Sequence, residues 1–251
     1  MIFWCIVPLT RIQNCEFIIE QFVLQNLDNK KLIFVQDNIV STSIVNNIIN
    51  IGSGTTGISE ALNAGLYFAR ENGSFDDWFV KWDDDDFYGP SYLQSIKIAQ
   101  QIGANMTGRS KLWMKTSDQK IWFINGSVGW SNSCNLHGST LAASLDCCDF
   151  THVDRCGEDT IWVQNMRQKG AKIWACEPKD HCYIRSGNND HAWPIPDFAI
   201  QPITGWEMYD CGTNNDYLIK TNNKPNWAKK HNGTINVKII DEIFNNFVNR
   251  E

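Results

Sequence analysis

Apolar and polar stretches alternate along the chain in the way expected of strands followed by helices. Residues 2–7 and 32–35 are short apolar runs, the first of which stops at Pro8. Runs of this length are typical of buried strands. The apolar residues between 15 and 22 recur at helical spacing, which predicts an amphipathic helix lying on a sheet. Strand, helix and strand in this order predict a parallel β-α-β unit with a right-handed crossover.

The same reasoning predicts further elements. Helices are expected to end near Gly73, Gly103 and Gly170, because glycine commonly follows a helix. The expected strands are 78–82, 111–115, 120–124 and 173–175, the expected helices are 58–73, 90–103, 157–170 and 235–247, and loops are expected at 135–141, before another short strand, and at 183–193. The glycine-rich residues 52–57 lack the Lys-Ser/Thr ending of a phosphate loop, so we interpret them as a flexible turn or a point where backbone approaches a nucleotide.

Four consecutive carboxylates follow the strand expected at 78–82. They are Asp83, Asp84, Asp85 and Asp86, and a Gly-Pro pair that opens the next helix comes shortly after them. Ligands of open α/β sheets bind at the carboxyl ends of the strands. Adjacent carboxylates repel one another, and a divalent cation among them would relieve that cost. We therefore predict a metal site here; the alternative is a solvated acidic turn.

Size and charge place the chain among ordinary soluble globular proteins. Its 251 residues are enough for one large α/β domain, or for one domain with a C-terminal extension. The net charge of -6 argues against broad, nonspecific binding of nucleic acid. The apolar residues 1–7 are too few for a signal peptide or a membrane span, so no transmembrane anchor is expected.

The nine cysteines are scattered without a regular framework, as expected of reduced thiols in a cytoplasmic protein. One subset competes for a metal, because Cys148, His152 and Cys156 are spaced by four. Further candidate zinc ligands are Cys147, Cys176, His181 and Cys182. The set lacks the paired C-x-x-C spacing of typical zinc sites, and buried free thiols are the alternative.

The order of motifs resembles family 2 glycosyltransferases of the GT-A fold, including phage and bacterial members. The motifs are Val7 to Arg11, Val35 to Asp37, Gly57 to Gly65, Asp83 to Asp86 with Pro90 and Leu93, Gly157 to Asp159, and Arg185 to Trp193. The resemblance implies an α/β fold with a mostly parallel central sheet flanked by helices. It implies a catalytic domain over 1–195, in which 1–103 bind the nucleotide sugar and 104–195 the acceptor, followed by an extension over 196–251.

The resemblance also implies an activity and a set of site residues. The activity is an inverting transfer of a hexosyl or pentosyl group from a nucleotide-diphosphate sugar, with a UDP-sugar favoured, to an acceptor hydroxyl, with Mn²⁺ or Mg²⁺ as cofactor. The acceptor would be a glycan, or a modified DNA base as in some phage members. The resemblance assigns donor binding to Pro8, Thr10, Arg11, Asp37, Asn63, Lys81, Asp83 and Arg185, metal binding to Asp83, Asp85 and His191, and the catalytic base to Asp159.

Several of these assignments have alternatives. Because the acids are consecutive, Asp84 or Asp86 could exchange roles with their neighbours. Asp159 also fits the first turn of any helix, where the macrodipole favours acids. Leu62 stands where many family members carry an arginine that faces the diphosphate, and Gln36 replaces a common acid. Two other functions are consistent with the acid cluster: nucleotidyl transfer on a related fold, and a non-catalytic module that binds carbohydrate or metal.

Overall fold

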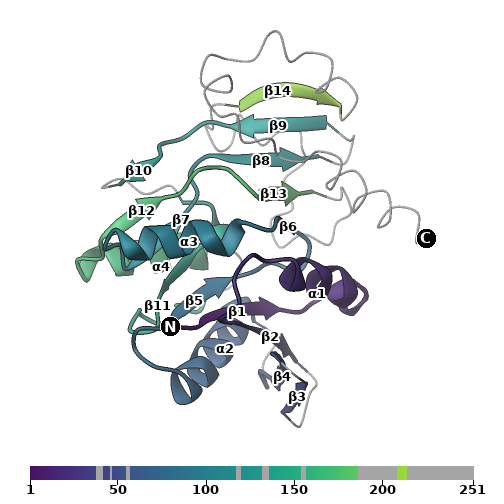
Figure 1. Cartoon of the computed structure of the whole chain (residues 1–251), viewed down its shortest axis with the longest axis vertical. Coiled ribbons are helices and arrows are strands. Elements are labelled where there is room, and N and C mark those ends of the chain that lie inside the picture. Colours follow the sequence, from purple (N-terminus) through teal and green to yellow (C-terminus); the bar gives the residue numbers. More distant parts are fainter. Residues whose placement is uncertain are drawn as a thin grey trace.

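The computed structural model describes residues 1–37, 42–45, 47–54, 57–116, 120–131, 136–153, 157–185 and 208–213. Within these ranges the chain forms a nine-stranded sheet and a five-stranded sheet (Figure 1). No helix in the described part of the chain combines the length and the apolar character needed to cross a membrane. The predicted helix over 235–247 lies outside the described residues.

The larger sheet has the strand order β10-β12-β7-β11-β5-β1-β2-β4-β3. Its strands are β1 (Phe3–Pro8), β2 (Lys30–Gln36), β3 (Ser43–Val45), β4 (Ile48–Gly52), β5 (Trp78–Lys81), β7 (Met106–Gly108), β10 (Gly129–Trp130), β11 (Ala142–Ser144) and β12 (Ile173–Ala175). Strand β1 pairs in parallel with β2 and β5, and β2 pairs in parallel with β4. The carboxyl ends of β1, β2 and β5 therefore meet at one edge, which is the edge that carries the acid run.

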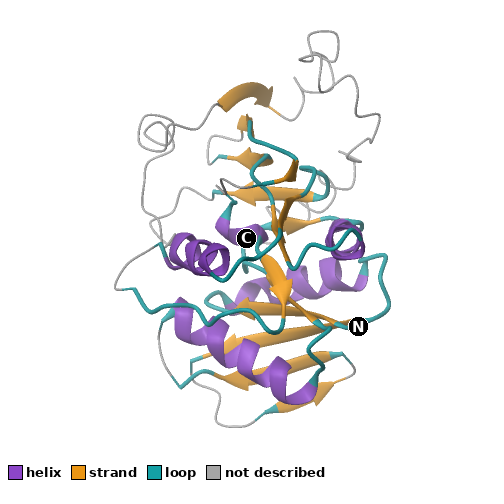
Figure 2. Ribbon diagram, turned by 90° about the vertical axis from the view of Figure 1, so that its left-hand side faces the viewer, coloured by secondary structure: helices purple, strands orange, loops and turns teal. Residues whose placement is uncertain are grey.

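Helices cover both faces of this sheet (Figure 2). They are α1 (Cys15–Val23), α2 (Ile58–Asn72), α3 (Tyr92–Gln101) and α4 (Glu158–Gln168), with short 3-10 turns η1 (Ile12–Asn14) and η2 (Gly138–Thr140). Alternate residues of β1 point to opposite faces. Ile6 packs in the cluster that contains residues of α2 and α4, whereas Cys5 packs in the cluster of α1 and α3. Residues 3–7 of the apolar run are buried because both faces of the strand are covered.

The smaller sheet has the order β14-β9-β8-β13-β6 (Figure 1). Its strands are β6 (Phe87–Tyr88), β8 (Leu112–Lys115), β9 (Lys120–Ile124), β13 (His181–Ile184) and β14 (Met208–Thr213). The predicted strands over 111–115 and 120–124 are confirmed as an antiparallel pair. Because β6 follows the acid run directly, the acids lie where the two sheets meet.

Most of the predicted helices and strands are confirmed within a few residues, and the expected α/β class is correct. The loop prediction for 183–193 is wrong at its start, because residues 181–184 form β13 between β8 and β6. The weakly patterned segment before residue 52 forms β3 and β4. In both places the strand comes from pairing with distant strands rather than from an alternating pattern in its own sequence.

A buried glutamine two residues after the end of α1 supports the segment that follows the acids. The amide nitrogen of Gln25 donates to the carbonyls of Gly89 at 2.7 Å and Tyr88 at 3.2 Å. Its amide oxygen accepts from the Leu93 N–H at 3.0 Å. One side chain thus holds the backbone on both sides of the turn between β6 and α3.

We expect Gln25→Met to lower the free energy of unfolding by about 2–4 kcal/mol, because each buried polar group left without a partner costs about 1–3 kcal/mol. The control is Gln101→Met at an exposed position of α3, expected to change stability by less than about 0.5 kcal/mol. Urea denaturation measures both, and equal effects of the two substitutions would contradict the assigned role of Gln25.

Candidate functional site

The four acids of the run differ in burial. Asp84 is 4% exposed and Asp86 is 0% exposed. The side chains of Asp83 and Asp85 keep 29% and 20% of their surface exposed. Buried and partly exposed carboxylates therefore alternate along the run, and only Asp83 and Asp85 can reach a bound molecule directly.

Asp84 binds the loop that follows β1. Its Oδ2 accepts hydrogen bonds from the N–H and hydroxyl of Thr10 and from the N–H of Arg11, all at 2.8 Å. Its Oδ1 accepts from the Arg11 guanidinium at 2.6 Å. The side-chain amide of Asn14 donates to the Asp84 carbonyl at 2.9 Å. Asp84 thus fixes the ends of β1 and β5 relative to each other.

Two cations neutralise the acids. The ammonium of Lys81, which is only 3% exposed, lies 2.8 Å from Asp83 Oδ1 and 3.5 Å from Asp159 Oδ1. The Arg11 guanidinium lies 3.2 Å from Asp85 Oδ2. Burial disfavours the charged ammonium, but Asp159 and Asp83 outweigh it and raise the pKa of Lys81 above its usual value. The expected repulsion is therefore relieved in part by these side chains.

Asp159 lies in the first turn of α4, as the helix pattern predicts, and its side chain also reaches the acid run. Gly157 precedes the helix with a φ of 111°, a conformation that favours glycine. Burial raises the pKa of Asp159 to about 6, against the opposing effect of Lys81 and with smaller contributions from Glu158 and Asp83. The carboxyl can therefore exchange a proton near neutral pH.

Other candidates for donor binding lie at the same sheet edge or near the smaller sheet. Pro8 ends β1 opposite Val35 of β2. Asp37 follows β2, and its carboxylate accepts from the Ser53 hydroxyl at 3.2 Å. Arg185 follows β13, is 4% exposed, and donates to the Tyr183 hydroxyl at 3.2 Å.

Asn63 is engaged elsewhere. Its amide nitrogen donates to the carbonyl of Phe150, and its oxygen accepts from the N–H of the same residue, both at 2.8 Å. The structure thus places Asn63 between α2 and the segment around residue 150. His191 lies outside the described residues.

The described residues contain no group of three or more His, Cys, Asp or Glu side chains that could hold a metal ion. For the cysteine-rich candidate, Cys156 lies outside the described ranges, and the His152 ring contacts Glu60. Burial raises the pKa of Cys147 to about 12, so its thiol stays protonated. At the acid run the described part of the chain supplies two of the three predicted ligands, Asp83 and Asp85.

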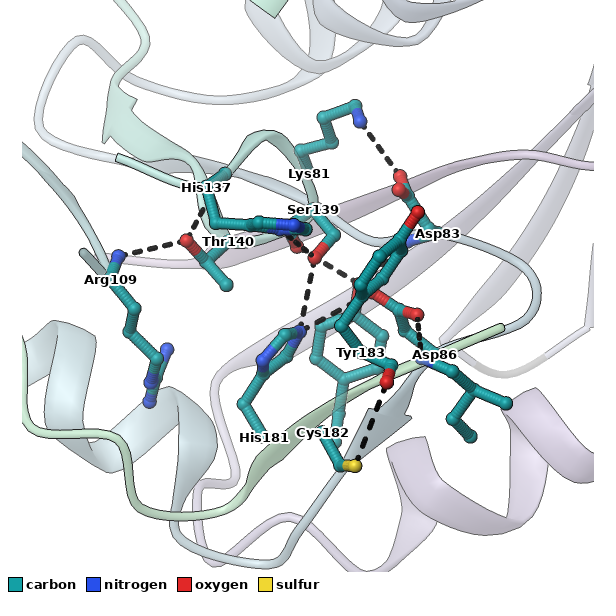
Figure 3. Close-up of polar contacts among 12 residues, drawn as sticks. Lys81, Asp83, Asp86, Arg109, His137, Ser139, Thr140, His181, Cys182 and Tyr183 are labelled. Atoms are coloured by element: carbon teal, nitrogen blue, oxygen red, sulfur yellow. Dashed lines mark hydrogen bonds and ion pairs between the residues drawn. The ribbon is translucent and has the colours of Figure 1, made fainter. Parts of the chain in front are cut away.

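A network of buried polar side chains lies behind the acids (Figure 3). No motif in the sequence predicts it. The Ser139 hydroxyl lies 3.0 Å from His137 Nδ1 and 3.1 Å from His181 Nε2. The same His181 nitrogen lies 3.4 Å from Asp86 Oδ2. Burial lowers the pKa of His181 and raises that of Asp86, so the interior disfavours the charged form of each side chain. Although it contains serine, histidine and aspartate, the network differs from a hydrolase triad, because Asp86 contacts the histidine nitrogen that faces Ser139.

Substitutions of Asp84 and Asp85 test whether a buried acid of the run contributes more to stability than a partly exposed one. Asp84→Asn is expected to lower the free energy of unfolding by about 2–3 kcal/mol, because the new amide brings N–H groups to the donors of Thr10 and Arg11. Asp85→Asn is expected to cost less than about 1 kcal/mol, because it removes only a partly exposed ion pair. Burial and Asp86 also raise the pKa of Asp85 to about 8, whereas an aspartate in an unfolded chain has a pKa of about 4, so the wild type loses stability as the pH rises between these two values, and the amide avoids that loss. Urea denaturation at the two ends of this pH range measures the stability of both variants. An equal loss of stability in the two variants would show that the buried and the partly exposed acid do not differ in their structural role.

No protein-family model matches the chain, and no curated protein matches it. Among solved structures it resembles residues 1–349 of Staphylococcus aureus TarS, with 14% identity, a TM-score of 0.50, and coverage of 73% of this chain and 60% of that chain. The complex of the same TarS fragment with UDP-GlcNAc gives 14% identity and a TM-score of 0.52, with 74% and 59% covered. The mannosyltransferase PcManGT of Pyrobaculum calidifontis, in complex with GDP-Man and Mn²⁺, gives 12% identity and a TM-score of 0.50, with 76% and 58% covered. The chain thus spans about 60% of the first of these structures. The arrangement of its sheets and helices is that of the GT-A glycosyltransferases, and the fold expected from the motifs is confirmed.

Proposed function

We propose that this protein is an inverting glycosyltransferase that moves a sugar from a nucleotide-diphosphate sugar to an acceptor hydroxyl and depends on Mn²⁺ or Mg²⁺. The observation that supports this most strongly is the position of Asp159. Lys81 holds its carboxylate beside Asp83, although the two acids lie on different elements and 76 positions apart in the sequence. A candidate base and the candidate ligands of a diphosphate-bound metal therefore share one strand end of a GT-A fold.

The residues at that strand end fit a divalent cation. Asp83 and Asp85 offer carboxylate oxygens, which Mg²⁺ and Mn²⁺ prefer. Burial and the neighbouring Asp86 disfavour the charge of Asp85, and a cation would stabilise that charge. Asp83, Asp85 and His191 would hold the metal, which supplies a positive charge to the diphosphate leaving group.

The donor would bind along the edge where β1 and β2 end. We propose that Pro8 and Asp37 border the nucleotide, because they end neighbouring parallel strands. Arg11 is placed to share its guanidinium between Asp85 and a phosphate oxygen. A UDP-sugar is the favoured donor, consistent with the UDP-GlcNAc bound by the TarS fragment. In this arrangement residues 1–103 supply most of the donor site, and residues 104–195 supply Asp159 and Arg185.

The chemistry proposed for Asp159 is general-base catalysis. An acceptor hydroxyl becomes a good nucleophile when a positioned carboxylate takes its proton during attack. A single displacement on the face of the sugar opposite the diphosphate inverts the anomeric centre. Lys81 orients the carboxylate by an ion pair and keeps part of its charge in the buried site.

Ligand-induced stabilisation tests the donor site. Among UDP, GDP, CDP and dTDP, one, with UDP expected, should raise the melting temperature by about 5–10 °C at 100 times its Kd, and only with Mn²⁺ present. Asp85→Asn should abolish the shift, whereas Asp76→Asn, at an exposed acid, should preserve it. Absence of a shift with all four nucleotides would favour a non-catalytic module, and pyrophosphate release from a nucleoside triphosphate would favour nucleotidyl transfer.

The pH dependence of turnover tests the base. With the donor saturating, nucleoside diphosphate release should fall about tenfold per pH unit below a pH of about 6, because protonated Asp159 cannot accept a proton. Asp159→Asn should bind the donor normally, lose at least ~100-fold in turnover and show no such acid limb. Unchanged turnover in this variant would remove Asp159 from the proposed mechanism.

A further inference from the structure

The Asp159 carboxylate packs closely against Gly138 of the η2 turn. A Cβ built on Gly138 would lie 1.9 Å from Asp159 Oδ2 and 2.6 Å from its Cγ. Gly138 is absent from the glycines with positive φ, so its backbone conformation would accept alanine. Glycine is therefore needed here for the close approach of the carboxylate and not for the shape of the turn.

The turn itself is fixed by its neighbours. The His137 N–H donates to the Arg109 carbonyl at 2.7 Å, and the Thr140 N–H donates to the His137 carbonyl at 3.0 Å. The Thr140 hydroxyl donates to the same His137 carbonyl at 2.7 Å and accepts from the Arg109 N–H at 2.8 Å. Figure 3 shows the Thr140 hydroxyl between His137 and Arg109. Gly138 thus lies in a turn whose neighbouring residues, His137 and Thr140, are both held by hydrogen bonds.

One hydroxyl joins this turn to the acid run. The oxygen of Tyr88 accepts from the Asp83 N–H at 2.7 Å, and its O–H donates to the Ser139 carbonyl at 3.0 Å. Tyr88 is 1% exposed, so its hydroxyl makes these hydrogen bonds in the interior of the protein. A continuous path of contacts therefore runs from the backbone of Asp83, through Tyr88 and Ser139, to Gly138, which the Asp159 carboxylate approaches closely.

We propose that Gly138 and Tyr88 are positioning residues, Tyr88 through its hydroxyl, and that together they determine where the Asp159 carboxylate lies relative to Asp83. As a contribution to catalysis, this inference rests on the proposed function, in which Asp159 is the base and Asp83 contacts the metal-bound donor. The two acids lie on separate elements, so their separation must be set by the contacts between those elements. Small displacements of a catalytic group are costly, because reaction requires the reacting atoms to be aligned.

Gly138→Ala is the direct test in the active enzyme. The added methyl group should displace the Asp159 carboxylate and reduce kcat by ~100-fold, whereas the donor Kd should change by less than ~3-fold. Donor affinity is the internal control, because Asp83 and Asp85 stay in place. A variant that keeps full kcat would overturn the proposal.

A stability cycle tests the same contact without any activity. Gly138→Ala should lower the melting temperature in the wild-type background, and most of that loss should disappear in Asp159→Ala, where only the Cβ, 3.2 Å from the added methyl, remains. Gly65→Ala is the matched control, because its added methyl would meet Ile6 at 2.4 Å, and its cost should be the same in both backgrounds. An equal cost of Gly138→Ala in the two backgrounds would contradict the proposal. If the wild type binds no nucleotide sugar, the proposed function fails, and this cycle still decides whether Gly138 places Asp159.

A comparison of Tyr88 with the neighbouring Tyr92 separates the effect of the hydroxyl from the effect of the ring. The rings of Tyr88 and Tyr92 both pack against Trp82, but among the described residues the buried Tyr92 hydroxyl has no hydrogen-bond partner. Tyr88→Phe should reduce kcat by ~10-fold, whereas Tyr92→Phe should stay within ~2-fold of wild type. Equal kcat values in the two variants would remove Tyr88 from the positioning role.

Discussion

The carboxylate of Asp84 is the contact on which the arrangement of the site depends. It accepts hydrogen bonds from Thr10 and Arg11 and so joins the ends of two parallel strands that are far apart in sequence. The same contact carries the Arg11 guanidinium toward Asp85. With Asp84 and Asp86 buried, Asp83 and Asp85 are left partly exposed. The buried Asp84 thus helps to determine that Asp83 and Asp85 are the acids of the run that can contact a ligand.

Lys81 is the second constraint, because it balances charge across two elements. Four adjacent carboxylates suggest that a metal must relieve their repulsion, but the structure contains an ammonium between Asp83 and Asp159 and a guanidinium at Asp85. Asp86 avoids repulsion by burial, which favours its neutral form. A bound cation would therefore meet acids that are already partly neutralised, and its charge would be available for a diphosphate.

Local sequence patterns were sufficient for much of the fold. The apolar runs of β1 and β5, the helical spacing in α2 and the glycines after α2, α3 and α4 predict these elements because short-range physics determines them. Strand β13 could not be predicted, since His181 to Ile184 become a strand only by pairing with β8 and β6.

The candidate site shows a similar limit. The acid run and Asp159 are visible in the sequence as residue types in suitable places, and they do lie together. The sequence offers no means of separating Asp84 from Asp85, because the difference lies in which side chain meets the loop after β1. The roles of Gly138, Ser139 and Tyr88 also depend on contacts between distant segments.

The central claim is that Asp83 and Asp85, and not their buried neighbours, receive a metal-bound diphosphate. Anomalous diffraction from crystals containing Mn²⁺ and a nucleoside diphosphate tests it most directly. The account predicts a manganese peak in contact with the carboxylates of Asp83 and Asp85. A peak at Asp84, at Asp86 or among the cysteines, or a bound diphosphate with no manganese beside it, would contradict the account.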